Sequence, residues 1–275
     1  MPAKNKSAKK KMKTKGLVDG SFDIFKALQL SKPKVAPPLW FLGDSIGKRV
    51  HQKIEAWHRD LAKTKKHNFA ADDIVSTIAE LTESQAVRIE NDISLDTAVL
   101  ALAAVYGLSR SNSVSTNDRV WDQLWDLSAA AQRCDSITEP LIKSIGLEIG
   151  IALCLVIADD QKLSQRFLVE EFEALVESNL DDDGWPDSRL LPLLGALAGS
   201  WARSFHLLTK QGMSLEQEIR MQLEWLVRQC LRLRSAGDGL SLAAINAVGI
   251  SRQCRYAQIR LMTGCHQPFG NECTV

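Results

Sequence analysis

The sequence contains two similar corners, in each of which an acidic residue and a glycine end one apolar helical run shortly before another begins. The first corner is Asp183-Gly184-Trp185, after the run 167–180, and the second is Asp238-Gly239-Leu240, after the run 215–233. Glycine adopts the positive φ with which many helices end, and aspartate can cap the helix that follows. The two corners are about one helical hairpin apart, so they predict stacked hairpins, closed into a toroid or open as a solenoid.

The composition favours an all-α fold. The chain has 275 residues, of which 45% are hydrophobic, so it can bury a large core. Its β-branched residues do not form alternating runs between hairpin turns, and no strand is therefore predicted. The expected organisation is a basic disordered tail at 1–16, a proline-containing linker at 17–43, a helical toroid-like domain at 44–248 and an irregular tail at 249–275.

The first residues differ in charge from the rest of the chain. Residues 1–15 contain seven lysines and no acidic residue, so the formal net charge of +1 leaves the remainder negative. Such a segment buries too little apolar surface to order itself, which predicts a disordered, solvated extension. Weak contact with nucleic acid or an anionic surface is the alternative. Nothing stronger is expected, because no arginine or aromatic residue accompanies these lysines.

No segment has the pattern of a secretory signal or of a membrane span. The lysine-rich start leads into Leu17-Val18-Asp19-Gly20 and not into an apolar stretch, which favours a cytoplasmic location. The most apolar run, 141–157, contains Lys143 and Glu148 and is shorter than the roughly 20 residues that a bilayer requires. It predicts a buried helix, and no membrane partner is expected.

The cysteines and acidic residues give little sign of a metal site. None of the six cysteines belongs to a C-x-x-C pair, and the spacing of Cys254, Cys265, His266 and Cys273 fits no zinc pattern. The run 181–183 lacks the alternate spacing of a calcium loop, so metal binding at either place is only the minor alternative. Phosphate-loop, dinucleotide and nucleophile-elbow motifs are absent from the sequence, and no metal or cofactor is predicted.

Several helices can be placed from their apolar patterns. The run 95–108 is apolar nearly all round, which predicts a central helix. Ser214 and Gln217 have the spacing of a capping box at the start of the run that ends near Leu233. Trp121 and Trp125 lie one turn apart, which favours packing against a neighbouring helix over a surface for stacking a sugar ring.

Three segments carry a resemblance to a known family. The stretch Leu180-Asp181-Asp182-Asp183-Gly184-Trp185-Pro186, its continuation through 190–203, and Glu224–Gln229 running into the second corner resemble the helical domain of heparinase II/III-like proteins. The similarity covers roughly residues 94–245.

The resemblance implies an α/α toroid followed by a β-sandwich, with an acidic polysaccharide in the cleft between them. Cleavage in that family is a β-elimination, in which a tyrosine or histidine removes a proton while a polar or cationic side chain neutralises the uronate. The candidate substrate-binding residues here are Trp185, Trp201, Arg203 and His206, the last two because a spacing of three can place both on one helical face.

The chain also departs from the family pattern. No β-rich segment follows the helices, and neither tyrosine, Tyr106 or Tyr256, lies in a motif of the family, so the catalytic residues are unknown. The sequence therefore predicts a truncated or catalytically incomplete helical domain that binds acidic polysaccharide and is inactive alone. The alternatives are a polysaccharide lyase completed by a missing domain, and a helical scaffold that binds a protein partner.

Overall fold

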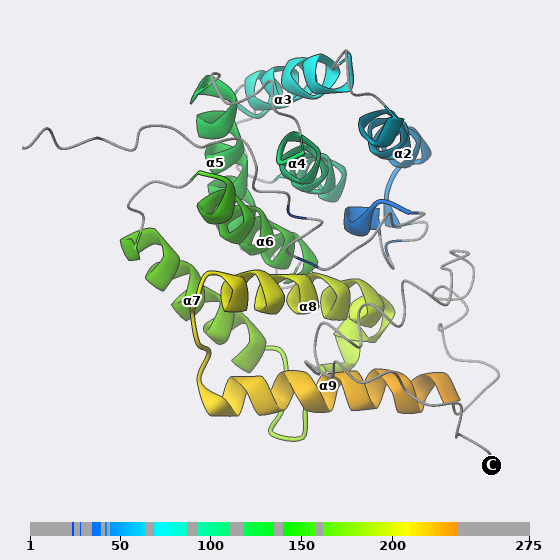
Figure 1. Cartoon of the computed structure of the whole chain (residues 1–275). Helices are drawn as coiled ribbons and strands as arrows, with labels where there is room; N and C mark the ends of the chain where they lie inside the picture. Colours follow the sequence, from blue (N-terminus) through cyan, green and yellow to red (C-terminus); the bar gives the residue numbers. More distant parts are fainter. Residues whose placement is uncertain are drawn as a thin grey trace, which may run out of the picture.

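The computed structural model describes residues 24, 28, 35–39, 42, 45–63, 69–86, 93–110, 118–134, 140–157 and 162–235. In these ranges the chain forms α-helices and short 3-10 helices and no strand, which confirms the all-α prediction. The elements, seen in Figure 1, are η1 (Pro37–Leu39), α2 (Lys48–Lys63), α3 (Phe69–Ala86), α4 (Leu95–Leu108), α5 (Asp118–Gln132), α6 (Pro140–Val156), α7 (Lys162–Glu177), η3 (Ser188–Leu193), α8 (Leu194–Lys210) and α9 (Gln217–Ser235).

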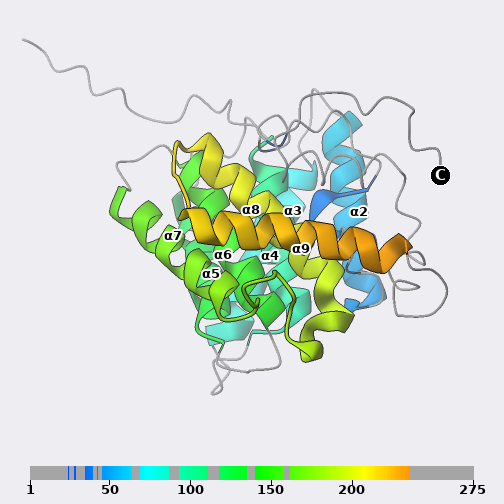
Figure 2. The same ribbon diagram turned by 90° about the horizontal axis from the view of Figure 1, so that it is seen from below.

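The helices pack as a succession of hairpins around α4 and α6. Each of α2, α4, α6 and α8 packs against the next in this order, and α6 also contacts α5 and α7. Helix α9 lies on the outside, against α7 and α8, as Figures 1 and 2 show. This packing agrees with the predicted hairpins, while closure into a toroid stays a prediction.

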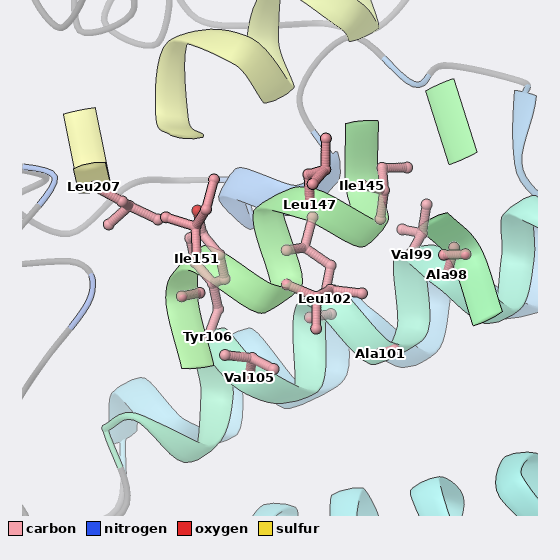
Figure 3. Packing of buried hydrophobic residues seen from close by; sticks show 14 of the residues in the cluster. Ala98, Val99, Ala101, Leu102, Val105, Tyr106, Ile145, Leu147, Ile151 and Leu207 are labelled. Carbon is pink, nitrogen blue, oxygen red and sulfur yellow. The ribbon is translucent and has the colours of Figure 1, made fainter. Parts of the chain in front are cut away.

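Helices α4 and α6 are central because apolar residues cover almost every face of each helix. Every residue of α4 from Ala98 to Leu108 is buried, and so is nearly all of α6. Figure 3 shows buried side chains of both helices, among them Leu102 and Val105 of α4 and Leu147 and Ile151 of α6. Within the described ranges, no helix combines the length and the apolar character needed to cross a membrane.

The segment expected to be a linker contributes to the core at the positions that can be described. Its buried side chains include Ile24, Leu28, Ala36, Pro37, Pro38, Leu39 and Leu42. The backbone N–H of Ile24 donates a hydrogen bond to Ser109 Oγ at 3.4 Å, just after α4. At these residues the segment therefore packs as part of the helical domain.

The first predicted corner is present, and both its backbone conformation and its close approach to α9 require a glycine. Gly184 has φ +72°, and a Cβ at this position would lie 2.6 Å from Cβ of Trp225 on α9. Asp181 Oδ1 accepts hydrogen bonds from the backbone N–H groups of Asp183 at 3.0 Å and Trp185 at 2.7 Å. The corner is therefore fixed in shape and lies directly on α9, whereas the second corner lies outside the described residues.

The segment 188–210 forms two elements, η3 and α8, because Pro192 lacks the N–H that a continuous α-helix would use there. The start of α9 differs from the sequence prediction. The predicted capping box is wrong, since α9 begins at Gln217, later than a cap at Ser214 requires. Instead, the backbone N–H of Glu216, just before α9, donates a hydrogen bond to Glu173 Oε1 of α7 at 2.7 Å. A side chain of another helix therefore accepts from a backbone N–H at the start of α9.

Candidate functional site

A cluster of polar side chains is buried where α4, α6 and α8 meet. At its centre is Glu148 of α6, which has no exposed surface. Arg203 of α8 donates from Nε to Glu148 Oε1 at 2.6 Å and from Nη2 to Oε2 at 2.9 Å. Tyr106 of α4 donates to Oε1 at 2.7 Å, and Ser200 donates to Oε2 at 2.8 Å. We call Tyr106, Glu148, Ser200 and Arg203 the buried polar cluster.

The neighbouring residue of α8 faces the same helix. Trp201 is 1% exposed, and its indole Nε1 donates to Ser144 Oγ of α6 at 2.9 Å. Ser144 in turn donates to the carbonyl of Pro140 at 2.7 Å. Trp201 and Arg203 together therefore fix α8 on α6 with directional bonds that purely apolar packing would not supply.

The four predicted substrate-binding residues lie in different environments. Arg203 binds the carboxylate of Glu148, which belongs to the chain itself. Trp201 is also internal, His206 is half-buried, and Trp185 is exposed on the corner. The structure thus brings Trp201 and Arg203 together against α6 and leaves Trp185 at the surface. Substrate binding by these residues stays a prediction.

The surroundings of Tyr106 do not favour a phenolate base. Burial raises the pKa of Tyr106 well above its ordinary value, and the nearby Glu148 carboxylate raises it further, while Arg203 acts in the opposite direction. The phenol therefore stays protonated at neutral pH, and it donates that proton to Glu148. A base for β-elimination needs the opposite arrangement, with a pKa lowered towards the working pH.

The raised pKa of Tyr106 gives a testable dependence of stability on pH. An unfolded phenol ionises near pH 10, whereas the buried one does not. Above that pH the unfolded state binds fewer protons than the native state, so stability falls as pH rises. We expect the free energy of unfolding, measured in urea from pH 8 to 11, to fall less steeply in Tyr106→Phe than in the native chain. Equal slopes would contradict the assignment.

The described cysteines in the helical faces act as apolar side chains. Burial raises the pKa of Cys154 to about 11 and that of Cys230 to about 12. Because the thiolate is the reactive and metal-binding form, these thiols are poor nucleophiles at neutral pH. They support packing and not chemistry.

A second candidate site lies at the surface, where the corner meets α9. Trp185 is 38% exposed and Met221 of α9 is 46% exposed. Met221, Trp225 and Arg228 share one side of α9 by helical spacing, and the Arg228 guanidinium lies 5.3 Å from the centre of the Trp225 ring. Gly184 rests on Trp225 and so brings the corner beside this side of α9. We call Trp185, Met221, Trp225 and Arg228 the corner surface. Helix α9, which carries three of these residues, is the helix nearest the viewer in Figure 2.

The surroundings of the corner surface are acidic. The three aspartates 181–183 are exposed, and none of them has an ion-pair partner within the described part of the chain. Asp187 is paired with Arg189 at 2.7 Å, and the hydrogen bonds from Arg189 lower the pKa of Asp187 to about 2. In the described ranges no group of three or more histidine, cysteine, aspartate or glutamate side chains is arranged to hold a metal ion.

Comparison with known proteins adds no relative. No protein-family model, curated protein or solved structure matches the chain. The likeness to heparinase II/III-like proteins rests on the sequence motifs alone.

Proposed function

We propose that this chain is a helical scaffold that binds a protein partner through the corner surface. The observation that carries the proposal is that the corner bearing the exposed Trp185 packs through Gly184 against Trp225 of α9. Exposed Met221 and Arg228 lie on the same side of that helix, with Arg228 over the Trp225 ring. Tryptophan, methionine and arginine are enriched in protein interfaces, and tryptophan and arginine supply many of the residues that dominate binding energy. Clustered apolar side chains on a surface commonly mark such an interface.

The corner surface is held in shape before any partner arrives. Asp181 fixes the backbone up to Trp185, and Gln229 Nε2 of α9 donates to the carbonyl of Asp183 at 3.4 Å. Leu226, on the buried side of α9, has no exposed surface and anchors the helix. A surface that is already ordered loses less conformational entropy on binding.

Charge favours a protein over an acidic polysaccharide. The exposed carboxylates of residues 181–183 would repel uronate or sulfate groups beside Trp185. Arg203, the residue expected to bind a substrate carboxylate, is already bound to Glu148 in the interior. The same carboxylates disfavour nucleic acid at this surface, and they favour a partner with a basic face.

A photo-crosslinking amino acid at position 185 tests the proposal in living cells. Phe167 is the matched control, since it is 54% exposed on α7 but lies about 15 Å along the helix from the end nearest the corner. We expect a protein that is captured from position 185 and not from position 167. The purified partner should then bind Trp185→Ala roughly 10- to 100-fold more weakly than the native chain, with little change for Phe167→Ala.

Two outcomes would reject the proposal. One is a captured protein whose affinity is the same for the native chain and for Trp185→Ala. The other is binding to a polysaccharide on a glycan array that Trp185→Ala abolishes, which would return the surface to carbohydrate recognition.

A further inference from the structure

The chain itself contains a segment whose charge complements the corner surface. We infer that the lysine-rich residues 1–15 dock on the corner surface of the same chain and compete with the protein partner. The inference rests on the proposed function, because it takes this surface to be a binding site and identifies one occupant of it.

The first argument is charge. Two acidic residues near the surface, Asp187 and Glu224, are paired with arginines, at 2.7 Å and 3.6 Å. The exposed aspartates 181–183 have no such partner within the described ranges, so they attract cations. Residues 1–15 supply seven lysines and no acidic residue. Attraction between such groups acts over about 8 Å at physiological salt.

The second argument is the exposed indole. Lys53 Nζ lies 5.5 Å from the ring centre of Trp57, and the Arg228 guanidinium lies 5.3 Å from that of Trp225. Trp185 is 38% exposed, and no cation lies over its ring among the residues that can be described. A lysine ammonium placed there would face the indole and the aspartate carboxylates together, which is a favourable site for a cation.

The third argument is reach. The segment joins the domain at Ile24, whose side chain is buried and whose N–H is bonded to Ser109. The 24 residues up to that point can extend to roughly 80 Å, which exceeds the roughly 45 Å diameter of a domain of this size. Covalent attachment within this reach gives the lysines an effective concentration at the surface of the order of millimolar.

Photo-crosslinking in the full chain tests the docking. A photo-crosslinking amino acid replaces Ser7, among the lysines, and the crosslinked residues are mapped by mass spectrometry. We expect crosslinks within the monomer that concentrate on 181–185 and 221–228. Their yield should fall several-fold in 1 M NaCl and in Asp182→Asn/Asp183→Asn.

The matched control is Asp122→Asn/Asp126→Asn, which removes two exposed charges on α5 and should leave the crosslinks unchanged. Crosslinks spread evenly over the surface would overturn the inference, and so would crosslinks found only between two chains. Replacing all seven lysines with glutamine should also tighten binding of the protein partner several-fold.

The two ideas can fail separately. If partner binding depends on Trp185 while the Ser7 crosslinks avoid the corner, only the docking of the lysine-rich segment is wrong. If Trp185→Ala leaves partner binding unchanged, the corner surface is not the binding site, and the proposed function fails first.

Discussion

Glu148→Ala is expected to lower the free energy of unfolding by about 3–5 kcal/mol, as measured by urea denaturation. The substitution removes the carboxylate and leaves the Arg203 guanidinium charged in the interior, where its side chain is only 3% exposed. Tyr106 and Ser200 also lose their acceptor in the same step. Buried donors without a partner add to the loss.

Two comparisons separate this effect from a general loss of packing. Glu148→Leu/Arg203→Met removes both charges and should be more stable than Glu148→Ala, since replacing a whole buried pair with apolar groups is often neutral. Tyr106 and Ser200 still lack their acceptor in this variant, so the recovery should be partial. Arg203 Nη1 has no hydrogen-bond partner in the described structure, so removing the arginine also removes a cost. Glu170→Ala breaks an exposed ion pair with Arg166 and should change stability by less than about 1 kcal/mol. Equal losses from Glu148→Ala and Glu170→Ala would contradict a structural role for the buried polar cluster.

Sequence patterns predicted the individual helices well because helix burial follows local spacing. The run 95–108 was expected to be central, and α4 is buried from Ala98 to Leu108. The apolar run 141–157 likewise corresponds to α6. The corner at Gly184 could be predicted because a positive φ is a local demand on the backbone.

The buried polar cluster could not be predicted in the same way, because its members come from three helices. Periodicity gives the side of a helix on which a residue lies, but not the neighbour that it meets. Arg203 was a candidate for binding a substrate carboxylate, and the same chemistry suits an internal one. A signal was present nonetheless: Glu148 is the only acidic residue of α6, and a carboxylate in so apolar a helix calls for a buried partner.

The contact between the corner and α9 also could not be predicted from the sequence. The sequence places Trp185 in the corner, but the approach of the corner to Trp225 follows from the position of α9. That position depends on the packing of α9 against α7 and α8. The corner surface is therefore a product of tertiary packing, and its integrity can be tested through a residue that no partner would touch.

Leu226→Ala is expected to lower the free energy of unfolding by about 2–5 kcal/mol, since it leaves a cavity on the buried side of α9. Leu226 has no exposed surface, whereas Glu218 in the first turn of α9 is exposed and Glu218→Ala should change little. A Cβ on Gly184 would lie 2.8 Å from the backbone N of Leu226, so loosening α9 also loosens the support of the corner. Leu226→Ala should therefore weaken partner binding as well, although its side chain is buried. Equal losses of stability from Leu226→Ala and Glu218→Ala would mean that the buried side of α9 is assigned wrongly.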